Sequence, residues 1–257
     1  AMTSTLLADG NETLGPPSIS IAAGSGYVSA GVGLSQSQPG IININVPAGA
    51  IVNQVLIYWE GQYTTANGDD AITVNGNNVT GTLIGGPDYF FSNNGGTLPV
   101  YSSTYRAHIS SFDLVSAGAN AISVSDLNND IANNGAGIFV IYSDGLPNTE
   151  IQLVDGNDLA YKFFPNPRGT MVAQTFTFTA ASTPRTAKLS MFFSSVQGIL
   201  STGGVLRPNQ ITVTVGATVT TFTDELLSND GQEWDTMTKL INIPAGETQL
   251  TVLAESG

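Results

Sequence analysis

The sequence predicts an all-β protein built of two tandem antiparallel β-sandwich modules of jelly-roll type. Short runs rich in Val, Ile, Thr, Phe and Tyr are separated by turn residues about every 8 to 12 positions, a spacing typical of sandwiches. Helical periodicity is almost absent. The second half of the chain also repeats the strand and turn signals of the first half in the same order, which indicates two copies of one structural unit.

The repeat can be followed from one apolar run to the next. The run Val55–Gly61 is matched by Leu189–Phe193, and Leu189 follows Val55 by 134 positions. The closing strands 121–124 and 249–252 each follow an Ala-Gly pair and lie 128 positions apart. The small drift in spacing is expected if only the loops had changed length, because loop length costs little free energy.

Three segments of the first copy have distinct signatures. Residues 71–82 predict a hairpin, because Asn75-Gly76 supplies the positive φ values of a tight turn. Residues 85–103 are rich in Gly, Asn and Ser, and we expect a long loop that its aromatic side chains hold to the protein. The unbroken apolar run Gly137–Tyr142 predicts a fully buried strand that closes the first module.

These signals divide the chain into three parts. Residues 1–17 form a flexible lead-in, residues 18–146 the first module and residues 147–257 the second. The second module has no counterpart of the apolar run 137–142 after its closing strand. Either a longer protein has been cut there, or the vacant sheet edge accepts a strand from a neighbouring subunit and so builds a fibre or tether.

The composition excludes several classes of partner. Acidic residues outnumber basic ones 20 to 7 and the net charge is −13, which argues against nucleic acid and against anionic membrane surfaces. No apolar stretch approaches the roughly 18 residues of a membrane span, so we expect no membrane insertion. With charged residues at only 11% and no cysteine, the surface is mainly uncharged and polar, as in many exported prokaryotic proteins.

Calcium is the cofactor that the acidic turns suggest. Oxygen-bearing side chains alternate from Asp126 to Asp130, and calcium binds six to eight such oxygens. The match to an EF-hand fails, since no Gly and no Glu stand at its required positions. Plain turn chemistry is the alternative, because Asp, Asn and Gly also favour turns for backbone reasons. The predicted metal ligands are Asp126, Asn128, Asp130, Asp155, Asn157, Asp158, Asp69 and Asp70.

Aromatic residues provide a second candidate binding site. The predicted loop contains the candidate ligand-binding residues Tyr89, Phe90, Phe91 and Tyr101, and a second group lies near the module junction at Tyr161, Phe163 and Phe164. Such rings can stack on sugar rings, so a carbohydrate-binding module is the first alternative function, with glycans as the partner. The competing interpretation is that the rings attach long loops to the core.

Residues with catalytic potential are few. His108 is the single histidine and no Gly-x-Ser-x-Gly motif is present, which argues against a serine hydrolase. Glu60 follows Trp59, and Glu233 and Asp235 flank Trp234, so a glycoside hydrolase is a further alternative. Nothing in the sequence pairs these carboxyl groups, and we therefore expect a protein that is not an enzyme.

The runs Val55–Trp59, Gly135–Asp144 and Gln232–Asp235 resemble the tandem β-sandwich regions of large secreted bacterial and archaeal surface proteins, which are adhesin-like. The similarity extends over most of residues 40–257 and implies an extracellular, cell-surface location with an adhesive or structural role. It transfers no catalytic residue. Our hypothesis is a surface or filament component, stiffened by calcium, whose open strand edge binds other copies of itself or other surface-protein domains.

Overall fold

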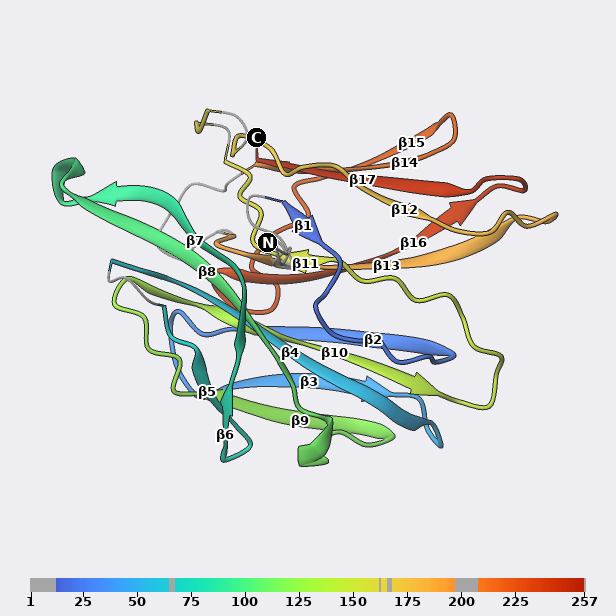
Figure 1. Ribbon diagram of the computed structural model, residues 1–257, viewed down its shortest axis with the longest axis horizontal. Helices are drawn as coiled ribbons and strands as arrows, with labels where there is room; N and C mark the ends of the chain where they lie inside the picture. Colours follow the sequence, from blue (N-terminus) through green and yellow to red (C-terminus); the bar gives the residue numbers. More distant parts are fainter. Residues whose placement is uncertain (1–12, 65–67, 162, 166–167, 197–207, 257) are drawn as a thin grey trace, which may run out of the picture.

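The computed structural model of this protein describes residues 13–64, 68–161, 163–165, 168–196 and 208–256. Within these residues the chain forms β-strands and two short 3₁₀ turns, η1 (Asn94–Gly96) and η2 (Ser110–Phe112). The strands are stacked in four layers of sheet (Figure 1), and all strand pairs within the sheets are antiparallel. The predicted all-β sandwich architecture is confirmed.

The first module consists of two sheets, each named here after one of its strands. The β3 sheet has the order β3-β9-β5-β6 and is an outer layer of the stack. Its strands are β3 (Gly40–Val46), β9 (Gly118–Ser125), β5 (Ala71–Val74) and β6 (Asn77–Thr80). The β4 sheet has the order β2-β10-β4-β8-β7. Its strands are β2 (Gly26–Gly33), β10 (Ala132–Ser143), β4 (Ile51–Tyr63), β8 (Leu98–His108) and β7 (Thr82–Asn93).

The first core lies between these two sheets. Alternate residues of a strand point to opposite faces, so Val55, Ile57 and Trp59 of β4 point towards the β3 sheet. There they pack with Ile42 and Ile122, and each of these five side chains is at most 3% exposed. The alternation that the sequence shows in β3 is therefore the alternation between this core and solvent.

The second module consists of a four-stranded and a two-stranded sheet. The β14 sheet has the order β12-β17-β14-β15 and is the other outer layer. Its strands are β12 (Gln174–Thr177), β17 (Gln249–Ser256), β14 (Asn209–Val215) and β15 (Thr218–Thr223). The β13 sheet pairs β13 (Arg185–Ser194) with β16 (Trp234–Ile243). The second core between them contains Ile211, Val213, Ile241, Leu250 and Val252.

The strand orders of the two modules correspond. The order β3-β9-β5-β6 of the first module matches β12-β17-β14-β15 of the second, strand for strand in chain order. The pair β4-β8 matches β13-β16 in the same way. The internal repeat seen in the sequence is thus a repeat of topology as well. Among the described residues, β2, β7 and β10 have no counterpart in the second module.

The second face of the β4 sheet is covered by the second module, so the central strands β4 and β10 are buried on both faces. Leu56 and Tyr58 of β4 and Phe139 and Ile141 of β10 form an apolar cluster with Phe192 of β13. The chain segments 19–22 and 151–153 complete the cover. A sheet buried on both faces requires apolar residues at consecutive positions, which explains the unbroken runs in β4 and β10.

Glycines on that second face allow the modules to approach closely. A Cβ atom on Gly31 would lie 2.2 Å from Nε1 of Trp234, and one on Gly137 would lie 2.7 Å from the ring of Phe192. Gly33 is crowded in the same way by the backbone of residues 231–232. Gly135 is crowded by the Val32 carbonyl and the Trp234 side chain. The Trp234 side chain is consequently only 2% exposed.

Polar contacts also join the modules. The Tyr27 hydroxyl donates to the Lys188 carbonyl at 2.7 Å, and Lys188 Nζ donates back to the Tyr27 carbonyl at 2.8 Å. The Lys188 ammonium group also lies 4.8 Å from the centre of the Tyr27 ring. At another point Arg168 Nη1 donates to the Tyr89 carbonyl at 2.5 Å.

The local predictions have different outcomes. The hairpin is confirmed: β5 and β6 are joined by Asn75 and Gly76, with φ values of 46° and 79°. The expected loop at 85–103 is wrong, because most of it belongs to β7 and β8. Three register shifts interrupt this pair, and the Gly-rich composition reflects such irregular pairing rather than a loop. Most of the predicted lead-in lies outside the described residues, while β1 (Leu14–Gly15) pairs with β11 (Asp155–Gly156).

Candidate functional site

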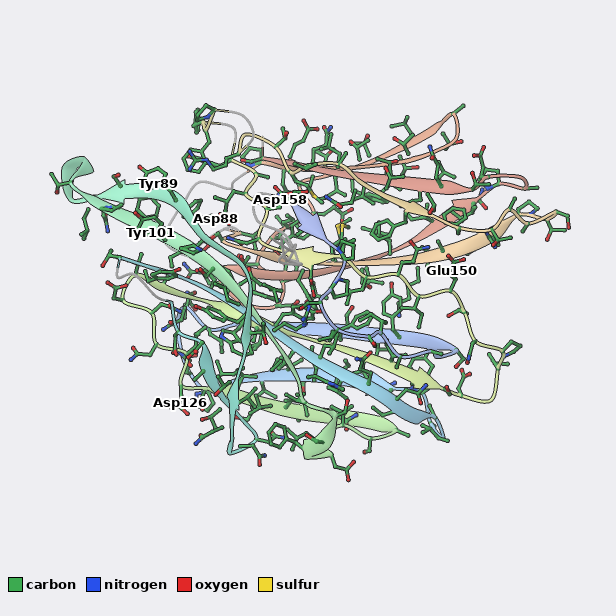
Figure 2. The ribbon with its side chains drawn as sticks, viewed as in Figure 1. Asp88, Tyr89, Tyr101, Asp126, Glu150 and Asp158 are labelled. Atoms are coloured by element: carbon green, nitrogen blue, oxygen red, sulfur yellow. The ribbon has the colours of Figure 1, made fainter. Side chains whose placement is uncertain are left out.

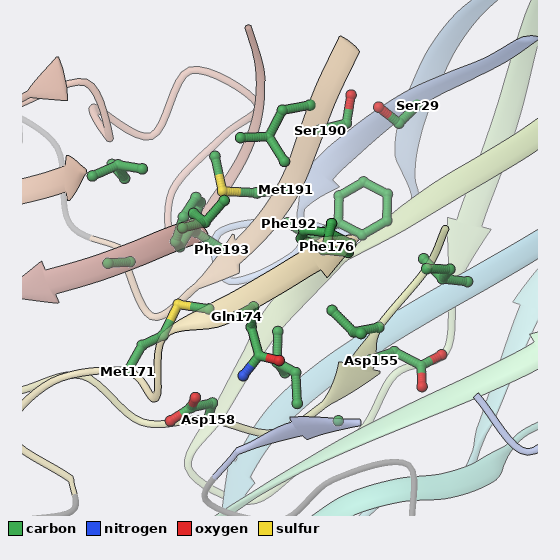
Figure 3. Close-up of a pocket in the computed structure, with 18 of the residues that line it drawn as sticks. Ser29, Asp155, Asp158, Met171, Gln174, Phe176, Ser190, Met191, Phe192 and Phe193 are labelled. Carbon is green, nitrogen blue, oxygen red and sulfur yellow. The ribbon is translucent and has the colours of Figure 1, made fainter. Parts of the chain in front are cut away.

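A cavity of about 750 Å³ lies between the two modules, and we call it the slot. One wall is β13, and another is the segment 148–161 that connects the modules. The first module contributes Tyr27, Ser29, Tyr58, Glu60 and Phe139, and the second contributes core residues such as Met171, Phe176 and Val252. Figure 3 shows Met171, Met191 and Phe193 on the module-two side, with Ser29 and Asp155 on the other side.

The slot runs along the edge of β13 that faces away from β16. In the first module β4 pairs on one side with β8 and on the other with β10. The corresponding strand β13 pairs with β16 alone within the described part of the chain. As a result, Gln54–Tyr63 of β4 are all buried, whereas all residues from Leu189 to Ser194 of β13 are only partly buried.

One end of the slot contains a buried carboxyl group. Glu60 is 2% exposed, and its two oxygens accept hydrogen bonds from Ser102 Oγ at 2.6 Å and Asn134 Nδ2 at 2.5 Å. Burial raises the pKa of Glu60, and the nearby charge of Glu233 raises it further, against the opposing effect of the hydrogen bonds. The sequence placed this residue at a core edge, and the structure places it between the modules.

The pH dependence of stability is expected to report on Glu60. Because its pKa is raised in the folded state, its stabilising contribution is complete below the ordinary value of 4.5 and is lost as pH rises through the raised pKa. Glu60→Gln should therefore gain stability relative to the parent between pH 4 and pH 8, by roughly 1.4 kcal/mol for each unit of pKa elevation. Urea unfolding across this range measures the difference, and parallel curves for the two proteins would contradict the assignment.

The acidic turn at 155–158 is largely buried against the first module. Arg106 Nη1 donates to Asp155 Oδ2 at 2.8 Å, and the Tyr58 hydroxyl donates to the same oxygen at 3.0 Å. Asn157 Nδ2 donates to Asp88 at 2.8 Å, and burial raises the pKa of that carboxyl group. Asp158 accepts the Val172 amide at 2.9 Å. In this structure the turn binds the connecting segment to β8.

The other predicted calcium ligands lie on a different part of the protein. Figure 2 shows Asp126 beside the β3 sheet, whereas Asp158 lies towards the second module. Asp69 accepts the Asn128 amide at 2.6 Å, so these two turns do come together, with Asp70 beside them. Asp130 binds the amide and hydroxyl of Thr64, whose hydroxyl lowers the pKa of Asp130.

The described residues contain no group of three or more acidic or histidine side chains that converge on one point. Hydrogen bonds from backbone amides and hydroxyl groups occupy Asp69, Asp126 and Asp130. Calcium binding therefore stays a prediction from the sequence.

The two aromatic groups that the sequence indicated separately meet in space. Phe90 of β7 lies 5.9 Å from Phe164 between ring centres, and Tyr89 lies 6.3 Å from Tyr101. The Arg168 guanidinium lies over both Tyr89 and Phe164, at 5.4 and 5.3 Å from the ring centres. Tyr89 and Tyr101 lie near the η1 end of the β7–β8 pair (Figure 2). Phe163 is 72% exposed and Tyr89 is 39% exposed, so these two rings of the aromatic cluster are open to solvent.

The carboxyl groups of the hydrolase alternative have different surroundings. Glu233 is close enough to Glu60 to raise its pKa, and it adopts a left-handed backbone conformation with φ of 70°. Asp235 is buried and accepts the backbone amides of Ser228 and Asn229 at 2.7 and 2.6 Å, which organises the turn before β16. His108 is exposed and shares a hydrogen bond of 2.8 Å with Ser110.

Arg106 and the glycines of β2 and β10 are not among the site residues that the sequence predicts. A signal for Arg106 existed, since it is the single basic residue between positions 1 and 161. The alternate glycines at 31, 33, 135 and 137 were a second signal, because glycines two positions apart in a strand clear one face of a sheet.

Comparison with known proteins adds no relative. The chain matches no protein-family model, and searches of curated proteins and of solved structures find no significant match. In the part of the chain that the structure describes, no helix has the length and apolarity to cross a membrane.

Proposed function

We propose that this protein is an extracellular structural or adhesive protein, a cell-surface or filament component in which two β-sandwich modules act as one rigid block. The observation that supports this function best is the face-to-face stacking of the modules. The β13 sheet lies on the β4 sheet through Trp234 and Phe192, and the connecting segment is held by the buried pair of Arg106 and Asp155.

Rigid stacking is unusual for tandem domains, since relative motion is the default unless the interface is large and apolar. A four-layer block transmits force or holds a binding surface at a fixed distance, which suits a surface or filament component. The acidic surface, with a net charge of −13 and few ionic groups, agrees with an exported protein.

Antibody labelling of the source cells tests the location, and a deletion strain tests the role. Intact cells should be labelled as strongly as permeabilised cells, and deletion should reduce adhesion or remove surface filaments. Labelling that requires permeabilisation would contradict the proposal.

Carbohydrate binding is the second candidate function, and the aromatic cluster favours it. Tyr89, Phe163 and Phe164 form part of an open aromatic surface next to the cationic Arg168, a combination that can stack on sugar rings. A glycan array should give signals that Phe163→Ala reduces at least about tenfold, with Phe112→Ala, another exposed ring, as the control. An array without any signal would remove this candidate.

A further inference from the structure

We propose that the slot is a strand-accepting site, which binds one extended segment of another protein chain antiparallel to β13. The inference depends on the slot alone and holds wherever the protein is located. Its basis is the internal repeat, because the first module shows what occupies the corresponding position.

In the first module that position is filled by β10. It pairs with β4 from Ala132 to Ser143, and its residues Ile138 and Val140 are fully buried in the first core. The partner of β10 corresponds to β13, and the slot lies along the edge of β13 that pairs with no strand among the described residues. A strand placed there would extend the β13 sheet as β10 extends the pair β4-β8.

Partly buried apolar side chains of the second core line the slot. Met191 and Phe193 of β13 and Phe176 of β12 belong to the second core but are only partly buried, and all three line the slot. Apolar side chains on one face of an incoming strand would cover them. Each apolar side chain that becomes fully buried contributes about 1.5–3 kcal/mol to the free energy of binding through the hydrophobic effect.

The backbone edge of β13 can bind such a strand. The Lys188 carbonyl points away from β16, since it accepts the hydroxyl of Tyr27, which also bonds to Ser190. Amide groups alternate in direction along a strand, so Ser190, Phe192 and Ser194 present theirs on the same edge. An added strand would replace the Tyr27 hydroxyl with a ladder of main-chain hydrogen bonds, as in other cases of strand addition.

These features specify the chemistry of the partner. It is an extended segment of about eight residues or more, with branched apolar residues at alternate positions towards the second core. Small residues such as Gly, Ala or Ser occur at part of the opposite face, as Gly135 and Gly137 do in β10. A cavity of about 750 Å³ would also suit a small apolar ligand. The open edge of β13 favours a polypeptide.

The test uses a peptide with the sequence of residues 134–143 added to the purified protein. Backbone exchange of Ser190, Phe192 and Ser194 should slow by roughly tenfold or more, and the melting temperature should rise with peptide concentration. The control peptide has the same side chains but N-methyl groups at alternate amides, and it should have no effect because it cannot form the ladder.

A second variant fills the slot within the chain. The sequence of residues 126–143 is appended after Gly257, because β10 follows β9 through this connection and β17 corresponds to β9. This variant should be more stable than the parent and should not bind the peptide. Two results would overturn the proposal: no protection of β13 by the peptide, or equal protection by the N-methylated control.

A small apolar probe tests the alternative that the slot binds a small apolar ligand and not a strand. Decanoic acid is added to the parent in place of the peptide, and β13 exchange is measured again. Protection by the fatty acid that the peptide cannot reproduce would identify the slot as a ligand cavity and overturn the strand proposal.

Discussion

Arg106→Met is expected to destabilise the folded protein by about 3–5 kcal/mol, because it leaves the buried carboxylate of Asp155 without its cation. The two side chains are 2% and 6% exposed, and Nη1 lies 2.8 Å from Oδ2. Arg106 also donates to Ser18 at 3.0 Å, so the substitution loosens the N-terminal segment as well. Urea unfolding at neutral pH measures the loss.

Two further variants show whether charge burial is the cause. Lys239→Met breaks a similar contact of 2.8 Å with Glu225, but here the side chains of Lys239 and Glu225 are 24% and 39% exposed. This substitution should therefore lower the free energy of unfolding by less than about 1 kcal/mol. The double variant Arg106→Met, Asp155→Leu should recover part of the stability that Arg106→Met loses, since no uncompensated charge remains. A loss for Arg106→Met as small as that for Lys239→Met would contradict this explanation.

Gly31→Val is expected to separate the modules locally at a cost of about 1–3 kcal/mol or more, because the new side chain occupies the space of the Trp234 ring. The Cβ alone would lie 2.2 Å from Nε1 of Trp234 and 2.7 Å from the Thr236 hydroxyl. Trp234 fluorescence should shift to longer wavelength and become accessible to acrylamide. Trp59, the other tryptophan, is fully buried in the first core and should change little.

The double variant Gly31→Val, Trp234→Leu is the matched control. If the clash with the indole ring causes the loss, removing the ring should make the two substitutions cost less together than the sum of their separate effects. Strict additivity, or an unchanged fluorescence spectrum in Gly31→Val, would contradict the packing described for the interface.

Local features of the fold could be predicted from the sequence where one short signal decides the structure. Asn75-Gly76 determines its hairpin because few residue pairs accept two positive φ values. The repeat could be predicted because the apolar runs that form the strands follow one another in the same order and at similar spacing in both halves of the chain. The β7–β8 pair was missed because irregular pairing leaves the same Gly- and Asn-rich composition as a loop.

The arrangement between the modules could not be predicted, because it depends on residues that are far apart in the chain. Asp155 resembles a calcium-binding turn residue until Arg106, 49 positions earlier, is placed beside it. Phe90 and Phe164 form one cluster only because the modules stack. The slot is formed by residues of several strands and of the connecting segment 148–161, so no single sequence motif predicts it.

The basic residues Arg106, Arg168 and Lys188 are concentrated at the junction between the two modules. These are three of only seven cations in the chain, and all three act where the halves meet, while both halves are acidic overall. The long-range electrostatic force between the halves is repulsive, and the short-range contacts oppose it. Dissolved salt shortens the range of repulsion to about 8 Å at 0.15 M, but it weakens the buried contact between Arg106 and Asp155 much less. Seawater or brine would therefore hold the halves together more firmly than fresh water does.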